Sequence, residues 1–151
     1  MTRIVSRVII RAAPAVVWQL ASNLAAQPEW MRDLVAVRFA SAQRSGPGVV
    51  MECDTRIGPF RLTDRIVVSE WQECRTIAIR HEGLVTGTGR FSIEPDLVGT
   101  RLTWIEELRF PWWLGGPVAG AAARPALTAT FRRDLSRLRR LAEAGVQAAH
   151  G

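Results

Sequence analysis

The chain has 151 residues, 48% of them hydrophobic, which suits a single domain with a sizeable core. Its formal net charge is +6, but all 20 basic residues are arginines, and they are spread along the whole chain. This spread is typical of a GC-rich coding sequence and does not indicate a dedicated surface for nucleic acid or an anionic membrane. One local cluster is the exception: Arg132, Arg133, Arg137, Arg139 and Arg140.

The first apolar segment is interrupted by Arg3, Arg7 and Arg11, so we predict neither a signal peptide nor a membrane-spanning helix. We therefore expect a cytoplasmic protein, in which Cys53 and Cys74 stay reduced. Neither cysteine has a metal-type spacing to another Cys or His, and we expect no metal and no cofactor.

The first predicted elements are a strand and two helices. Residues 2–12 alternate between two faces as a strand does. Pro14 suits the first turn of a helix, and apolar residues recur at helical spacing as far as Leu24. A second short helix is expected within residues 27–35, opened by Pro28.

Three strands are predicted next, over residues 35–43, 49–57 and 60–71, because turns rich in glycine and proline separate these alternating runs. In the second run, the odd-numbered residues form the core face. In the third, Asp64 lies on the more apolar face. Such an aspartate either makes a structural hydrogen bond at the rim of the core or contacts a ligand.

The segment from Arg75 to Phe110 is predicted to form three paired strands, and its two turns fix their register. The deduced pairs are Ile77 with Phe91, Ile79 with Gly89, His81 with Gly87, Ile93 with Leu102, Phe91 with Trp104, Gly89 with Glu106, and Gly87 with Leu108. A glycine inside a strand is typical of a bend, a bulge or a close approach to the backbone. Two glycines on one inward face therefore predict a curved sheet, a void, or both.

His81 and Glu106 border this glycine patch. Two strand spacings, roughly 9–10 Å, and one diagonal step separate them, so we do not expect a direct hydrogen bond between the two side chains. Both could instead reach into one space and meet a ligand or a water molecule. The alternative is that His81 lies in the open at a strand end and that an arginine neutralises Glu106.

A long C-terminal helix is predicted from about Val118, with Pro125 either kinking it or dividing it into two segments. Gly145 is the expected end of the helix and of the domain, which covers residues 1–145, and residues 146–151 are expected to fray. The apolar stripe of the predicted C-terminal helix consists of Leu127, Phe131, Leu135, Leu138 and Ala142. The clustered arginines fall mostly off this stripe, which indicates a solvated face.

Three stretches carry a family resemblance: residues 9–34, GTRLTWIEEL at 99–108, and FRRDLSRLRRLAE at 131–143. In this order they resemble the START-like (SRPBCC) superfamily, which includes Bet v 1-type proteins and aromatic polyketide cyclase/dehydrases. The resemblance covers nearly the whole chain. It implies an α+β helix-grip fold, in which a curved antiparallel sheet wraps around a long C-terminal helix and two short helices follow the first strand.

The resemblance also implies a deep apolar cavity between the sheet and the long helix. Matched onto this sequence, its ligand-binding residues would be Trp30, Met31, Met51, Cys53, Thr55, Asp64, Ile66, Ile79, His81, Gly87, Gly89, Phe91, Trp104, Glu106, Leu108, Leu127 and Phe131. A mostly apolar lining with a few polar groups is the usual composition of a small-molecule site.

Two main functions fit these residues. The broader one is binding of a hydrophobic ligand, such as a lipid, a polyketide-like molecule or an aromatic metabolite, with His81 and Glu106 orienting its polar end. The other is cyclisation or dehydration of such a molecule, with Glu106 as the base and His81 as the acid or proton relay.

A third interpretation is binding of nucleic acid or another partner through the arginine-rich helix, which we expect less. Two further residues, Trp112 and Trp113, could contact a membrane surface near the portal or cover an edge of the core.

Overall fold

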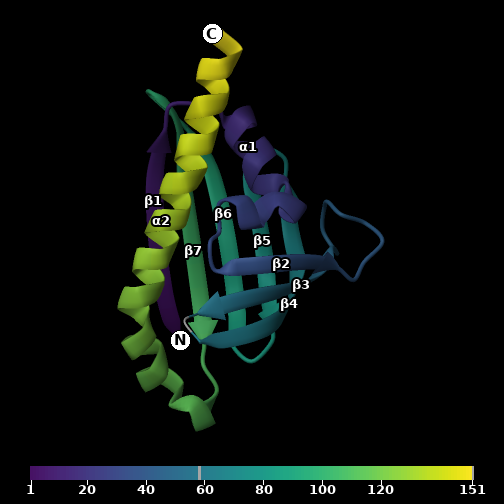
Figure 1. Ribbon diagram of the computed structural model, residues 1–151, viewed down its shortest axis with the longest axis vertical. Coiled ribbons are helices and arrows are strands. Elements are labelled where there is room, and N and C mark those ends of the chain that lie inside the picture. Colours follow the sequence, from purple (N-terminus) through teal and green to yellow (C-terminus); the bar gives the residue numbers. More distant parts are fainter. Residues whose placement is uncertain (58, 151) are drawn as a thin grey trace.

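The computed structural model describes residues 1–57 and 59–150. They form one seven-stranded antiparallel sheet with the strand order β1-β7-β6-β5-β4-β3-β2. A long C-terminal helix and two short helices lie against it (Figure 1). The strands are β1 (Thr2–Ile10), β2 (Leu34–Phe39), β3 (Val50–Ile57), β4 (Phe60–Gln72), β5 (Thr76–Glu82), β6 (Thr86–Asp96) and β7 (Gly99–Arg109).

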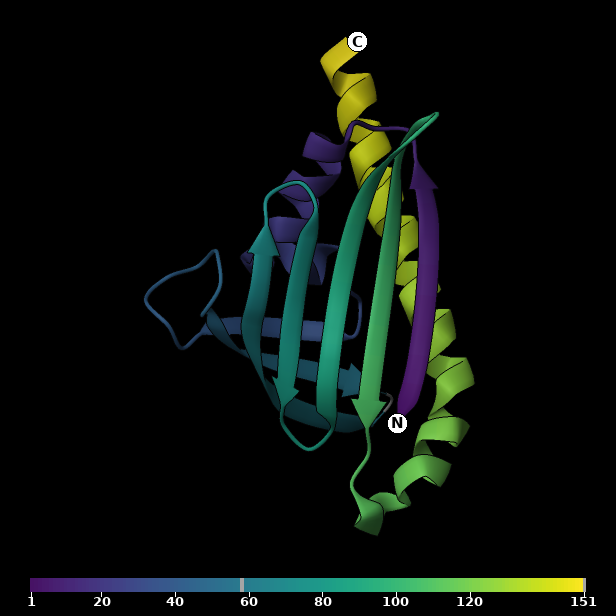
Figure 2. The same cartoon turned by 180° about the vertical axis from the view of Figure 1, so that it is seen from behind.

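The sheet is strongly curved. In Figure 1, β2, β3 and β4 run across the view while β1, β5, β6 and β7 run along it, and Figure 2 shows the same bend from behind. The pairing register shifts at two places, in β2 between Leu34 and Ala36 and in β4 between Val68 and Glu70. These irregularities accompany the bend. The curvature predicted from the paired glycines is therefore present, and it gives the sheet a concave face.

Every strand pair deduced for residues 75–110 is confirmed. Alternation explains this success, because each strand of the segment has one apolar face. On β7, Leu102, Trp104, Glu106 and Leu108 are all buried, and a shift of one residue would turn them outward. The core face predicted for β3 is also correct, since Val49, Met51 and Cys53 are buried.

Two strands end earlier than predicted. β1 stops at Ile10, and β2 stops at Phe39 although its pattern continues to residue 43. The Ser41 hydroxyl donates a hydrogen bond to the carbonyl oxygen of Gln43 and accepts one from the Val50 N–H, so this segment bonds within its own loop.

The predicted helical pair exists, but its second member was misplaced. Helix α1 (Pro14–Ser22) begins at Pro14 as expected, and the second helix is a 3₁₀ helix, η1 (Leu24–Glu29), with Pro28 inside it. A helix over residues 27–35 is excluded because Leu34 already pairs with β3.

Helix α2 (Gly116–His150) packs along β1 and β7 and covers the concave face. Its buried positions include Leu135, Leu138 and Ala142, as the apolar stripe predicted. The helix begins two residues earlier than predicted, contains Pro125, and continues through Gly145, so the expected end at Gly145 is wrong. Val146 packs against the core, and the expected fraying of residues 146–151 stays a prediction.

The expected α+β helix-grip architecture is thus confirmed. A short 3₁₀ turn, η2 (Trp112–Leu114), links β7 to α2. Among the described residues, no helix is both long and apolar enough to cross a membrane.

The packing of α2 yields a stability prediction. We expect Leu138→Ala to lower the free energy of unfolding by about 2–5 kcal/mol, because Leu138 is fully buried between the helix and the sheet. Leu141→Ala, on the outer face of the same helix, should cost less than about 1 kcal/mol, because Leu141 is 39% exposed. Urea unfolding of the two variants measures the difference, and equal losses would contradict the packing described.

Candidate functional site

A cavity of about 190 Å³ lies between the concave face of the sheet, the end of η1 and the inner face of α2. Most of its wall is apolar. Its acidic and histidine side chains include Asp64, His81 and Glu106 on the sheet and Asp134 on the helix. The other polar residues of the lining are Gln27, Asp33, Thr55, Arg90 and Thr130. The cavity is therefore a mostly apolar chamber with polar groups on both the sheet and the helix.

All but two of the residues predicted to bind a ligand line this cavity. Trp30 does not, because it is 1% exposed and packs behind the wall against Phe91 and Trp104. Gly87 does not either, because its Cα faces the backbone of β7, where an added Cβ would lie 1.9 Å from the Glu107 carbonyl oxygen. The lining residues that sequence reasoning missed are Leu24, Gln27, Asp33, Leu34, Ile77, Arg90, Thr130 and Asp134.

Three side chains from three strands form a hydrogen-bonded chain at the sheet end of the cavity. His81 on β5 lies with Nε2 2.8 Å from Glu106 Oε2 on β7, and with Nδ1 3.3 Å from Asp64 Oδ2 on β4. Trp104 donates its Nε1–H to the other oxygen of Glu106 at 2.8 Å. Asp64 thus makes the hydrogen bond that one alternative predicted. It also lines the cavity, so its contact with a ligand stays a prediction.

The direct contact between His81 and Glu106 corrects the sequence-based expectation. That expectation counted the spacing of the strand backbones and left out the length of the two side chains. Strand β6 lies between β5 and β7, and at this level it contributes only glycines. A Cβ added to Gly89 would lie 2.5 Å from Glu106 Oε1, so the missing side chain is the space in which the carboxylate lies.

The imidazole of His81 holds its proton firmly. Burial alone would lower the pKa of His81, but the hydrogen bonds and negative charges of Asp64 and Glu106 outweigh it and raise the pKa to about 10. At neutral pH, His81 is therefore an imidazolium that donates to both carboxylates. Glu106, 4% exposed, is balanced by this histidine, so the alternative in which an arginine neutralises Glu106 is wrong.

An aromatic wall faces the polar chain. Trp104 stacks on Phe131 of α2, with ring centroids 4.1 Å apart and an interplanar angle of 26°. Phe91 lies beside Trp104 with centroids 5.1 Å apart. The indole of Trp104 therefore joins two functions, since its face packs on the helix while its N–H holds the carboxylate.

Two other lining groups are titratable. Burial raises the pKa of the Cys53 thiol to about 12, so it stays protonated and is a poor nucleophile. Burial also raises the pKa of Asp134 to about 6. Within residues 1–57 and 59–150, no group of three His, Cys, Asp or Glu side chains is arranged to hold a metal ion.

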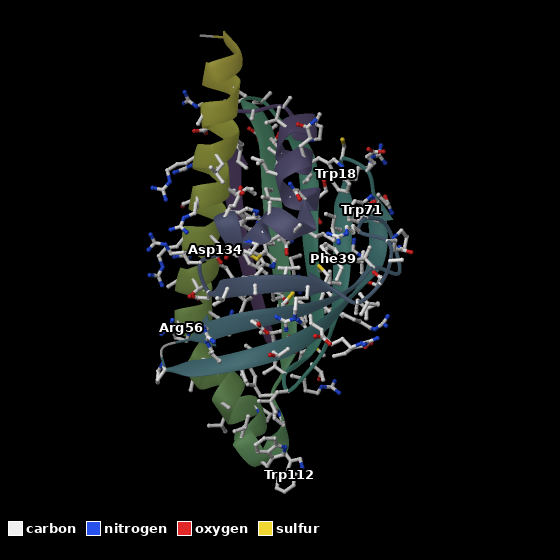
Figure 3. All side chains as sticks on the ribbon, turned by 45° about the vertical axis from the view of Figure 1, so that its right-hand side comes forward. Trp18, Phe39, Arg56, Trp71, Trp112 and Asp134 are labelled. Carbon is white, nitrogen blue, oxygen red and sulfur yellow. The ribbon has the colours of Figure 1, made fainter. Side chains whose placement is uncertain are left out.

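The tryptophan pair of η2 does not cover an edge of the core. Trp112 is 86% exposed and Trp113 is 60% exposed, and Figure 3 shows Trp112 pointing away from the fold at one end of the molecule. Contact of these residues with a membrane surface stays a prediction.

The charge of His81 makes stability depend on pH. The folded pKa of about 10 exceeds the ordinary value of 6.5, so the stabilisation from the imidazolium is fully present below pH 6.5 and is lost as the pH rises through about 10. We expect the stability difference between the native protein and His81→Gln to shrink over this range in urea titrations. An imidazole resonance of His81 that titrates near pH 6.5 by NMR would contradict this arrangement.

Solved structures share the fold at low sequence identity. One domain of the di-domain ARO/CYC StfQ from the steffimycin biosynthetic pathway superposes with a TM-score of 0.81 at 15% identity, covering 97% of this chain and 52% of that protein. Protein DR_A0006 from Deinococcus radiodurans gives 0.72 at 14% identity, with 96% and 99% covered. Ara h 8.0201 gives 0.62 at 11% identity, with 90% and 97% covered. The chain spans about half of StfQ, and these likenesses establish the fold alone.

The sequence itself identifies the family. No curated protein matches it at a significant level. A family model does, and its match extends over residues 1–143, which include every strand, both 3₁₀ helices, α1 and most of α2. The chain therefore belongs to the polyketide cyclase / dehydrase and lipid transport family.

Proposed function

We propose that the protein binds a small, largely apolar molecule in the cavity between the sheet and α2. The observation that carries this proposal is the cavity itself, an apolar chamber with a polar chain fixed at one end. Well-packed interiors rarely leave such a space. The family includes lipid-transport proteins and cyclases, both of which fit a bound hydrophobic molecule.

The size of the cavity limits the ligand. A protein cavity of about 150 Å³ holds a benzene molecule, so about 190 Å³ suits a molecule of one or two rings or a short chain. A longer lipid or a molecule with several fused rings would exceed this volume unless part of it extended out of the cavity. We therefore favour a small aromatic or short-chain ligand.

The polar chain indicates which group of the ligand it would orient. Both ring nitrogens of His81 are already bonded to carboxylates. Each oxygen of Glu106 accepts one hydrogen bond, and a carboxylate oxygen can accept a second. The Glu106 oxygens can therefore accept a further hydrogen bond. The ligand group best suited to this end of the cavity is a hydroxyl or an enol that donates to Glu106.

A pair of matched substitutions tests the cavity. Ile79→Trp should abolish binding of an apolar fluorescent dye such as 1-aminoanthracene, because Ile79 lines the cavity and a larger side chain would fill it. Ile105→Trp makes the same change on the opposite face of the sheet and should leave dye affinity within about twofold, since Ile105 lies outside the lining. Dye binding that is equal in both variants, with circular dichroism unchanged, would refute the proposal.

A second candidate function, dehydration of a β-hydroxy ketone or a related polyketide-like molecule, is favoured by the Glu106–His81 contact. Glu106 would take a proton from the carbon beside the carbonyl group. Once Glu106 is neutral, the Nε2–H of His81 would turn from this carboxyl group to the departing hydroxyl and give it the proton, and the hydroxyl leaves as water. Glu106 would then carry a proton and His81 would lack one. Because Oε2 and Nε2 are 2.8 Å apart, the proton can pass directly from Glu106 to His81 and restore both groups.

This chemistry has its own test. The probe is 4-hydroxy-4-phenylbutan-2-one, a one-ring molecule whose dehydration gives a conjugated enone that is followed by ultraviolet absorbance. Glu106→Gln should reduce the rate at least about 100-fold while probe binding is retained, because the amide cannot act as the base. Glu107→Gln on the outer face of β7, where the side chain is 40% exposed, should keep the native rate. No acceleration by the native protein, or full activity of Glu106→Gln, would leave ligand binding as the function.

A further inference from the structure

A second hollow lies directly beside the apolar cavity, on the side of α2 that faces the segment after η1. Its lining residues are Arg32, Asp33, Thr130, Arg132, Arg133, Asp134, Ser136, Arg137 and Arg140. Its volume is about 360 Å³. We call it the arginine recess. It shares Asp33, Thr130 and Asp134 with the apolar cavity, so the same three residues form the wall between the two spaces.

The recess has an excess of positive charge. It holds five arginines and only two aspartates. Several arginines on the sheet are paired with carboxylates, as in Arg38 with Asp54 and Arg80 with Glu82. In contrast, none of the ion pairs found among the described residues involves a recess arginine. Arg133 Nε donates a long hydrogen bond, 3.4 Å, to the Ala129 carbonyl oxygen. Among the described residues, the recess guanidinium groups have no carboxylate within ion-pair distance, so they can bind an external anion, for which arginine has the best geometry.

The residues shared by the two spaces are polar. Asp134 is 4% exposed on the inner face of α2, and Figure 3 shows it at the level of the segment after η1. Within the described part of the chain, its Oδ1 accepts a single long hydrogen bond, from the Arg32 N–H at 3.4 Å. Thr130 lies one helical turn before it and is half-buried. A ligand that extends past Thr130 would leave the apolar cavity and arrive among the arginines.

We propose that the arginine recess binds the anionic group of an amphipathic ligand whose apolar part occupies the cavity, with a carboxylate or a phosphate as the recognised group. The proposal rests on the proposed ligand-binding function and specifies its ligand class. The recess opens to solvent, since Arg32, Arg132, Arg133 and Arg140 are exposed, and it adjoins the apolar chamber. Basic surface next to apolar surface suits an amphipathic anion, whereas a nucleic acid has no apolar part to enter the chamber and would use the arginines alone. Binding of such an anion also gives the arginine cluster a role that a solvated helix face would not have.

Matched ligands and matched variants test this inference. The ligands are 1-octanol, octanoate and octyl phosphate, which share a chain and differ in the head group, and calorimetry measures their affinities at low ionic strength. We expect at least one of the two anions to bind about tenfold more tightly than octanol, because charge-assisted hydrogen bonds add to the apolar contact. Whichever anion shows the larger gain identifies the preferred group, carboxylate or phosphate.

The variants are Arg137→Gln, which lies in the recess, and Arg139→Gln, which is equally half-buried on the same helix but outside it. Both remove one positive charge. Arg137→Gln should abolish most of the preference for the anion and leave octanol affinity unchanged, whereas Arg139→Gln should leave both unchanged. Raising the salt concentration should reduce anion affinity and leave octanol affinity unaffected.

Each contrary result has a distinct meaning. If octanol binds but neither anion binds more tightly, the recess proposal is overturned while the proposed cavity function stands. Equal loss in the two variants would also overturn it, because the effect would then be one of overall charge. Displacement of octanoate by mixed-sequence DNA, to the same extent in both variants, would assign the arginines to nucleic acid. If no ligand binds, both proposals are wrong.

Discussion

The arrangement of the site depends on the space above Gly89. A side chain at this position would collide with Glu106, so only glycine lets the carboxylate lie flat against β6 and reach His81. The contact in turn holds the imidazole between two carboxylates and leaves Trp104 to satisfy the remaining oxygen. The absence of a side chain at Gly89 on β6 thus allows the positions of four residues on three other strands. They are Asp64 on β4, His81 on β5, and Trp104 and Glu106 on β7.

This arrangement places three ionised side chains beside the apolar cavity, and removing them from water costs free energy. Two carboxylates and one imidazolium leave one net negative charge beside an apolar chamber. Buried ion pairs of this kind rarely add net stability compared with apolar residues of the same shape, because desolvation offsets their attraction. The cavity is otherwise apolar, so a role in binding a ligand explains this charged group better than a contribution to stability does. The same reasoning applies to Asp134 on the opposite wall.

The sequence allowed the fold and strand register to be predicted because both follow from short-range patterns. Alternation and two turns were sufficient to pair Phe91 with Trp104 and Gly89 with Glu106. Features that depend on curvature could not be deduced in this way. The His81–Glu106 hydrogen bond requires two long side chains to converge across a gap, and a count of strand spacings does not describe that convergence. Trp30 likewise occupies a position behind the wall that only the packed aromatic cluster defines.

Asp134 illustrates a signal that was present but not used. It lies three residues after Phe131 and immediately before Leu135, on the edge of the apolar stripe of α2. A carboxylate at helical spacing among buried residues is unusual enough to mark a site. The arginine recess could not have been found this way, since it combines residues of α2 with Arg32 and Asp33, about 100 positions earlier in the chain.

The pairing of β1 with β7 has a consequence for how the protein folds. The remaining strands form a series of hairpins between sequence neighbours, but Thr2 pairs with Leu108, at the far end of the sheet segment. Closing the long loop between β1 and β7 costs more chain entropy than closing a hairpin, and this cost slows their pairing. The hairpins can therefore form before β1 joins the sheet. Helix α2 packs largely on β1. The chamber therefore gains its last wall only when the two ends of the chain have met, which makes its completion a late event in folding.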